Sequence, residues 1–217
     1  MADTKTEILE ATETALLEHG YHDLTTQKVA EGFGGSHSLV HYHFETKEDL
    51  LIAFLDRYRE QVSAFLTDIE DEPPGARLVT LLEALGSSAN RPRARRLYLG
   101  VLELQAYAGR HEAYRETLEA YNETLFAFTV ATIEDGITSG AFADCDPAPT
   151  ARLLLVSVRG ALVEECTVGI DVVEQVVSDA LLEHVLADLY VDEPPEIDVP
   201  TPDEPATAIE YEPGEDE

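Results

Sequence analysis

Hydrophobic side chains recur at intervals of three and four residues along most of this chain, from Thr4 to Tyr190. That spacing places them on one face of an α-helix. Glycine and proline interrupt the pattern, above all at Gly20, at 72–75 and at Gly140, where helices are expected to end. The sequence therefore predicts an all-α protein, with helices over residues 4–19, a short stretch from 25, 36–43, 47–70, 76–88, 92–108, 111–139, 150–168 and 171–190.

The first part of the chain predicts two short helices joined by a tight turn and followed by a long third helix. The hydroxyls of Thr25, Ser36 and Thr46 are each placed to cap a helix, because each can accept a hydrogen bond from an unpaired N–H. Gly34 can take the positive φ that the turn needs. This is the pattern of a helix-turn-helix, whose second helix, over residues 36–43, would enter the major groove of DNA.

A small core is expected to hold these helices together. The helix over residues 4–19 is amphipathic and should form the floor of this core, and Gly20 ends it. Tyr21 would then fold back into the core. Its expected neighbours are Leu24, Val29, Phe33, Val40 and Phe44.

The same stretch resembles a known family. It contains, in order and without a gap, Gly20-Tyr21, Thr25-Thr26, Ala30-Glu31, Gly34, His43-Phe44 and Lys47-Glu48 followed by Leu50. This order resembles the DNA-binding region of the bacterial and archaeal regulators named after the tetracycline repressor, TetR. The resemblance implies a three-helix helix-turn-helix DNA-binding domain over residues 1–46. A helical ligand-binding and dimerisation domain would follow over residues 47–190.

The resemblance also implies which side chains reach DNA. Carried over by position, they are Thr25, Thr26, Gln27, Ser36, His37, Ser38, His41, Tyr42 and Lys47. Gln27, His37 and Ser38 have donors and acceptors for base edges. Thr25, Tyr42 and Lys47 suit phosphate oxygens, although Thr25 has an alternative role as a cap alone.

Two positions in this region depart from the family pattern. His41 stands where a tyrosine is usual, and Gly35 stands where an aliphatic residue is usual, which should loosen the turn. His37 and His41 are four residues apart on one helix, a spacing that could also bind a metal ion. No third ligand follows the familiar pattern, so we expect a DNA-facing role, with no metal site and no cofactor.

The predicted second domain is rich in aromatic residues. Aromatic walls with a few polar groups are what a small-molecule pocket needs. The candidate ligand-binding residues are Tyr98, Leu102, Gln105, Tyr121, Phe126 and Arg159. Aromatic residues at helical spacing are also common in plain cores, and the sequence does not separate the two readings. The arginines at 91, 93, 95 and 96 could hold an anionic ligand or offset neighbouring carboxylates.

The last two predicted helices suggest a dimer. Residues 150–168 are apolar on nearly every face, so this helix must be covered all round. Asp171 and Glu174 resemble a capping box at the start of the last helix. The resemblance implies that these helices, over about residues 150–190, pair with those of a second copy in a four-helix bundle.

Charge sets this chain apart. The formal net charge is −30, and lysine occurs only at positions 5, 28 and 47. At about 1 M salt the Debye length falls to roughly 3 Å, so dense like charge then costs little. We infer a halophilic, archaeal source. Residues 191–217 contain eleven acidic residues, six prolines and no basic residue, which predicts a disordered acidic tail.

Other features narrow the class of protein. The sequence has no apolar stretch of membrane-spanning length and no apolar signal region near its N-terminus, so we expect a cytoplasmic protein without membrane contact. Cys145 and Cys166 have no CxxC partner, which argues against a disulfide or a zinc site. No catalytic motif appears, so an enzyme is not expected.

The resemblance thus implies a homodimeric repressor that a small-molecule effector releases from a palindromic DNA operator. The alternative is a ligand-binding or protein-interaction module without sequence-specific DNA binding. That alternative draws on residues 1–56, where three lysines and eleven acidic residues give a net charge of −8.

Overall fold

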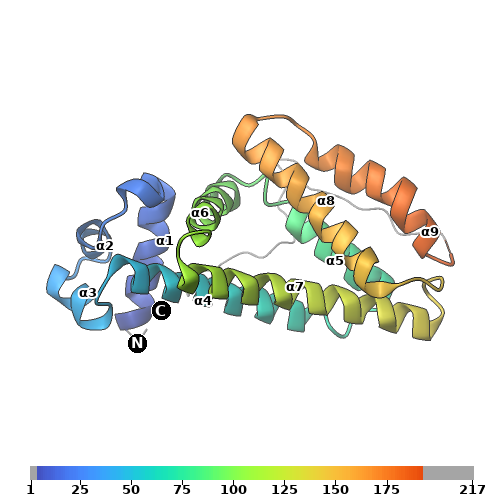
Figure 1. Cartoon of the computed structure of the whole chain (residues 1–217), viewed down its shortest axis with the longest axis horizontal. Helices are drawn as coiled ribbons and strands as arrows, with labels where there is room; N and C mark the ends of the chain where they lie inside the picture. Colours follow the sequence, from blue (N-terminus) through green and yellow to red (C-terminus); the bar gives the residue numbers. More distant parts are fainter. Residues whose placement is uncertain (1–3, 193–217) are drawn as a thin grey trace, which may run out of the picture. The chain divides into compact units, whose positions relative to one another are not determined.

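The structure is a computed structural model, and it describes residues 4–192. Over these residues the chain is helical, which confirms the predicted fold class (Figure 1). The elements are α1 (Thr4–Asp23), α2 (Thr26–Gly32), α3 (His37–His43), α4 (Lys47–Asp68), α5 (Pro74–Gly86), α6 (Pro92–Ala108), α7 (Glu112–Ser139), α8 (Pro147–Val168), η1 (Gln175–Ala180), η2 (Leu182–Leu186) and α9 (Ala187–Leu189).

Helix boundaries follow the glycines and prolines of the sequence. Gly20 interrupts α1 with φ 70° and ψ 170°, and Gly140, with φ 78°, follows the end of α7. α5 begins at Pro74 and α8 at Pro147, each slightly earlier than predicted, because proline is tolerated in the first turn of a helix.

The start of the last helical segment differs from the prediction. The N–H groups of Val172 and Val173 donate to Oε2 of Glu165, at 3.1 and 2.8 Å. The predicted capping box of Asp171 and Glu174 is therefore replaced by a carboxylate from α8. η1 and η2, within the predicted last helix, form π-helical turns, and these are wider than α-helical turns.

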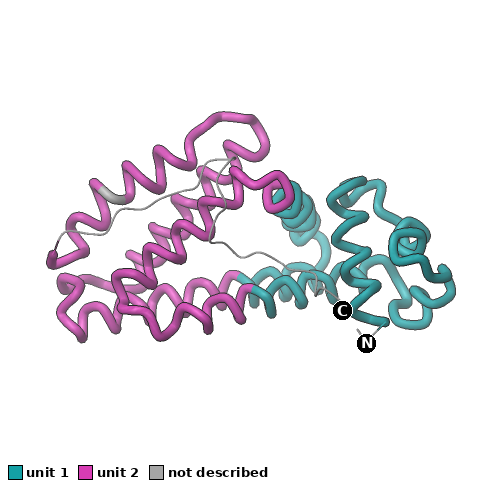
Figure 2. Tube along the Cα trace, turned by 180° about the vertical axis from the view of Figure 1, so that it is seen from behind, with its two compact units in different colours: residues 1–61, 96–121, 211–217 teal, residues 62–95, 122–210 magenta. Residues whose placement is uncertain are grey.

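Contacts divide the described chain into two compact units (Figure 2). Unit 1 contains the residues up to Gln61 and Arg96–Tyr121, and unit 2 contains Val62–Arg95 and the residues from Asn122 onward. Helices α4, α6 and α7 each contribute residues to both units. The predicted boundary between a DNA-binding domain, residues 1–46, and a ligand-binding and dimerisation domain, residues 47–190, stays a prediction.

The core of unit 1 contains the residues expected beneath the short helices. Tyr21, Leu24, Val29, Val40 and Phe44 are buried, and Phe33 packs against them partly buried. The same core extends further than predicted, to Val101 and Leu104 of α6 and Tyr114 and Leu118 of α7. At Gly100 the α6 backbone lies so close to α1 that an added Cβ would be 2.9 Å from the Leu16 side chain.

In unit 2, Tyr190 contacts the first turn of α5 and the loop that follows α7. The Tyr190 hydroxyl donates to the Gly75 carbonyl at 2.7 Å, and the Tyr190 ring lies 4.8 Å from the Phe142 ring, between centroids. An added Cβ at Gly136 would be 2.0 Å from the Phe142 ring, so α7 requires glycine at this point. Arg77 Nη1 and Asp135 Oδ2 form an ion pair at 2.9 Å.

One face of α8 is open in the single chain. Leu153 and Val156 are 53% and 56% exposed, so the described part of the chain does not provide the cover predicted for this helix. Among residues 4–192, no helix is long and apolar enough to cross a membrane. The predicted acidic tail, apart from residues 191 and 192, lies outside the described residues.

Candidate nucleic-acid interface

The turn between α2 and α3 is built as the sequence predicts. The Thr25 hydroxyl accepts from the Lys28 N–H, and the Ser36 hydroxyl accepts from the Leu39 N–H, each at 3.2 Å, which confirms both caps. Gly34 has φ 70°, as the turn requires. α2 and α3 are therefore held in a helix-turn-helix arrangement.

Gly35 has a structural reason that the sequence did not reveal. An added Cβ at this position would be 2.1 Å from the Phe33 ring. The N–H of Gly35 donates to the Ala30 carbonyl at 3.1 Å. Glycine thus lets the Phe33 ring pack beside the turn, and in this conformation the departure from the family pattern fits the turn instead of loosening it.

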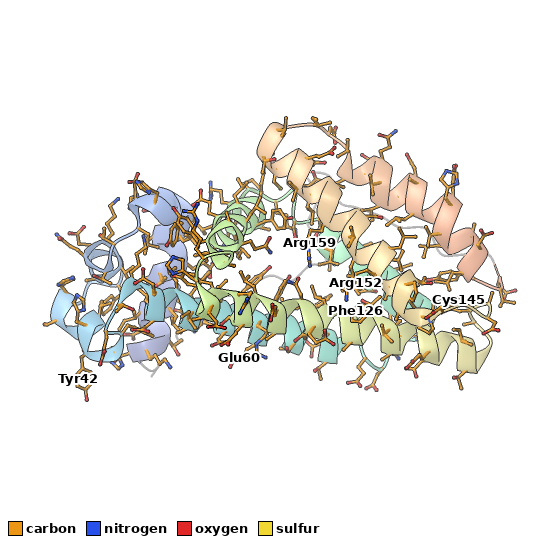
Figure 3. The ribbon with its side chains drawn as sticks, in the orientation of Figure 1. Tyr42, Glu60, Phe126, Cys145, Arg152 and Arg159 are labelled. Atoms are coloured by element: carbon orange, nitrogen blue, oxygen red, sulfur yellow. The ribbon has the colours of Figure 1, made fainter. Side chains whose placement is uncertain are left out.

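The nine predicted DNA-binding residues are exposed or half-buried. Tyr42 is 82% exposed and points away from the other helices of unit 1 (Figure 3). Thr26 Oγ1 lies 3.0 Å from His37 Nε2, which links α2 to the first turn of α3. The His37 and His41 rings meet edge to face at 4.4 Å between centroids. These contacts bring Thr26, His37 and His41 together on one exposed surface.

Four other predicted residues contact neighbours within the unit. Gln27 Nε2 donates to Glu31 Oε1 at 3.1 Å, within α2. The hydroxyls of Ser36 and Ser38 are 2.9 Å apart. The Lys47 amino group donates to the Tyr21 carbonyl and lies 4.3 Å from the centroid of the Tyr21 ring.

The first turn of α4 presents Lys47 through a reciprocal cap. The Asp49 N–H donates to the Thr46 hydroxyl at 3.0 Å, which confirms the predicted cap, and the Thr46 N–H donates to Asp49 Oδ2 at 3.0 Å. Partial burial lowers the pKa of the Lys47 amino group below its ordinary value. The Asp49 carboxylate of this cap lies at the helix start, where it offsets unpaired N–H groups.

The electrostatics of α3 differ from those of the chain as a whole. α3 contains three histidines and no carboxylate, although the chain carries a formal net charge of −30. Within residues 4–192, no three His, Cys, Asp or Glu side chains are grouped to hold a metal ion. α3 can therefore approach a polyanion without electrostatic repulsion from a carboxylate of its own.

The six predicted ligand-binding residues fall into both packing units. In unit 1, Tyr98, Leu102 and Gln105 lie half-buried along α6, and Tyr121 stacks on Tyr58 with 5.5 Å between centroids. Burial, together with the neighbouring Tyr121 and Glu13, raises the pKa of the Tyr58 phenol well above its ordinary value.

In unit 2 the other two predicted residues lie where α7 and α8 face each other (Figure 3). Arg159 Nη2 donates to Asn122 Oδ1 at 2.6 Å, and the Arg152 guanidinium lies 3.9 Å from the centroid of the Phe126 ring. The predicted set did not include Tyr58, Asn122 or Arg152, which contact three of its members. Helical spacing could have indicated two of them, since Asn122 is four residues from Phe126 and Arg152 is seven from Arg159.

Unit 2 also has an open pocket of about 230 Å³ between α4 and α7. It is lined by Ser63, Leu66, Thr67, Glu70, Thr124 and Phe128. None of these was a predicted ligand-binding residue. Thr124 and Phe128 lie on a different face of α7 from Asn122 and Phe126, because residues two apart in a helix point in nearly opposite directions.

Comparison with known proteins adds independent information. Residues 8–54 match the family model described as bacterial regulatory proteins, tetR family. A TetR transcription regulator from Haloarcula marismortui is 33% identical, with a TM-score of 0.80 over 87% of this chain and 100% of that one.

More distant structures share the fold. A transcriptional regulator from Saccharomonospora viridis in complex with choline is 22% identical, with a TM-score of 0.72 over 87% of this chain and 98% of that one. The SmeT–triclosan complex, from the repressor of a Stenotrophomonas maltophilia multidrug efflux pump, is 21% identical, with a TM-score of 0.75 over 92% of this chain and 98% of that one. No curated protein matches the sequence.

Proposed function

Because the chain belongs to the TetR family of DNA-binding transcription regulators, we propose that it is a homodimeric repressor that a small-molecule effector releases from a palindromic operator. The observation that carries this proposal is the exposed α3 helix. It is capped by Ser36, braced against α2 through His37 and free of carboxylates of its own. The family acts by binding DNA and not by catalysis.

In the proposed complex α3 lies in the major groove. His37 and Ser38 face base edges from its first turn, where a recognition helix makes its base contacts, and Gln27 does so from α2. Tyr42 and Thr25 bind phosphate oxygens with their hydroxyls. Thr26, Ser36, His41 and Lys47 complete the interface. Lys47 would reach a phosphate after exchanging its contact with the Tyr21 carbonyl.

The dimer forms through α8 and the last helical segment. The exposure of Leu153 and Val156 supports this, since adjacent exposed apolar side chains on a helix mark an interaction surface. Gly160 gives a sharp test, because an added Cβ there would meet nothing within 4 Å in the single chain. Gly160→Arg should therefore leave the subunit folded and convert dimer to monomer in sedimentation velocity. An unchanged dimer mass for both Gly160→Arg and Leu153→Arg would exclude this interface.

The effector would bind among the half-buried aromatic and polar side chains of the helices that follow α4. Each unit has its own candidates for such a site: Tyr98, Leu102, Gln105 and Tyr121 in unit 1, and separately Phe126 and Arg159 in unit 2. The choline and triclosan complexes of similarly folded regulators support an effector of small-molecule size. Since α4 is one continuous helix from Lys47 to Asp68, it is the proposed element through which effector binding alters the DNA-binding part.

The charge supports a halophilic archaeal source and a cytoplasmic location. At the molar salt of such a cytoplasm, carboxylate repulsion and the attraction of lysine to phosphate are both screened. Binding must then be measured at molar KCl, because low salt would exaggerate repulsion between DNA and a chain of net charge −30.

The decisive experiment measures binding to the DNA upstream of the protein's own gene and to a scrambled duplex of equal length, at about 1 M KCl. A specific regulator should prefer its operator by roughly a thousandfold. His37→Ala should reduce that preference and Tyr42→Ala should weaken the binding of both duplexes, whereas His22→Ala, which removes an exposed histidine of α1, should change neither. Equal binding of the two duplexes by the wild-type protein would rule out the operator.

The alternative, a module without sequence-specific DNA binding, draws on the net charge of −8 of residues 1–56, which contain three lysines and eleven acidic residues. The same binding experiment separates the two. Equal binding of both duplexes together with an intact dimer would favour the module.

A further inference from the structure

One residue of the DNA-binding part has both of its backbone polar groups bound by side chains of other helices. Gly20 leaves helical geometry, with φ 70° and ψ 170°, so the hydrogen-bond ladder of α1 is interrupted there. The Tyr21 N–H donates to Oε2 of Glu103 in α6 at 2.7 Å. The Tyr21 carbonyl accepts from the Lys47 amino group in α4. The part of α1 that follows the kink at Gly20 is thus held by two charged side chains.

The Tyr21 side chain is held by the same helices and by α7. Tyr21 is 9% exposed, and its ring lies 4.3 Å from the Tyr107 ring of α6, between centroids. Tyr114 of α7, which is 1% exposed, belongs to the same core. Both the backbone and the ring of Tyr21 therefore connect the C-terminal part of α1 to α6.

We propose that Glu103 is a positioning residue for DNA binding: its carboxylate, bound to the Tyr21 N–H, sets the orientation of α2 and α3 from α6. This inference rests on the proposed operator binding, and the contact that carries it is the Tyr21 N–H bond to Glu103. Glu103 touches no DNA in this account and acts through the backbone of Tyr21.

The side chain at 103 allows reach and charge to be varied separately. Glu103→Asp keeps the negative charge but is shorter by one carbon–carbon bond, about 1.5 Å, which is enough to break the hydrogen bond. Glu103→Gln keeps the reach and an acceptor oxygen while removing the charge. Glu116→Ala removes an exposed carboxylate of α7 and controls for the change in net charge.

The test measures operator affinity of the full-length protein at about 1 M KCl for wild type and these three variants. Glu103→Asp should bind about tenfold more weakly, the loss expected for one charge-assisted hydrogen bond, while Glu103→Gln and Glu116→Ala stay within about threefold of wild type. A purely structural role would instead give the same loss of affinity as of thermal stability for every variant. Equal affinity of Glu103→Asp and wild type would overturn the inference.

Amide hydrogen exchange at Tyr21 gives a readout that does not depend on the operator. The Tyr21 amide should exchange at least about tenfold faster in Glu103→Asp than in wild type or Glu103→Gln. If wild type shows no operator preference, the proposed function fails, and this inference about DNA binding fails with it. If wild type binds its operator but Glu103→Asp changes neither affinity nor exchange, this inference alone fails.

Discussion

Replacing Glu165 by alanine should destabilise the protein more than any other change to a charged side chain of α8. Glu165 is 7% exposed, and Oε2 accepts from the N–H groups of Val172 and Val173 at 3.1 and 2.8 Å. These N–H groups open the last helical segment, and an unpaired buried donor costs free energy because it has lost its water. The side chain of Val173 is fully buried, so water cannot easily replace the carboxylate.

The expected magnitude follows from the two hydrogen bonds. A hydrogen bond to a charged group contributes about 1.5–3 kcal/mol, and the two bonds share one acceptor oxygen, so we expect Glu165→Ala to cost about 2–4 kcal/mol. Glu165→Gln retains an acceptor and should cost about 1 kcal/mol. For a chain of this size the alanine variant should lower the melting temperature by roughly 5–15 °C.

Thermal unfolding followed by circular dichroism at fixed protein concentration and about 1 M KCl measures this difference, since subunit concentration affects the stability of an oligomer. Glu164→Ala is the matched control: the neighbouring carboxylate is exposed, and its loss changes the net charge by the same amount. The control should shift the free energy of unfolding by no more than about 0.5 kcal/mol. If the two alanine variants melt at the same temperature, the capping role of Glu165 is refuted.

Three further outcomes follow from the structure. Burial raises the pKa of the Cys166 thiol, and Cys166 is 5% exposed, so iodoacetamide should label the half-buried Cys145 at least about tenfold faster, as peptide mass spectrometry would detect. Burial likewise raises the pKa of the Tyr114 phenol, so folding favours the neutral phenol. The resulting contribution to the free energy of unfolding is complete below about pH 10 and is lost as pH rises above that value. Between about pH 9 and 11, Tyr114→Phe should therefore lose less of its free energy of unfolding than wild type, as urea titrations at each pH would measure. Because residues 1–56 contain three lysines and no arginine, the slope of log affinity against log salt should be no steeper than about −3 per subunit, and a steeper slope would contradict the proposed interface.

The sequence predicted the helices and the local geometry at their ends. Thr25, Ser36 and Thr46 cap their helices as expected, Gly34 takes the positive φ expected of it, and α7 ends just before Gly140 as expected. These features depend on residues within four positions of one another. Periodicity and capping chemistry describe that range well, because the interacting groups are neighbours along the chain.

The contacts that the sequence did not predict join residues far apart in the chain. Glu103 binds the Tyr21 N–H across 82 residues, and Arg159 binds Asn122 across 37. A solvated carboxylate and a hydrogen-bonded carboxylate look alike in a sequence, so neither Glu103 nor Glu165 was among the predicted functional residues. The predicted capping box at Asp171 failed for the same reason, since a distant side chain was available and local spacing cannot reveal it.

The acidic composition and the DNA-binding role are compatible because charge is unevenly distributed. α3 has no carboxylate, and the acidic residues of the first turn of α4 include Asp49, which is used in the cap of that helix. In concentrated salt, distant carboxylates are screened within about 3 Å, so only groups in direct contact with DNA influence binding strongly. Recognition must then depend on short hydrogen bonds and on the orientation of α3, which increases the importance of residues such as Glu103 that fix that orientation without touching DNA.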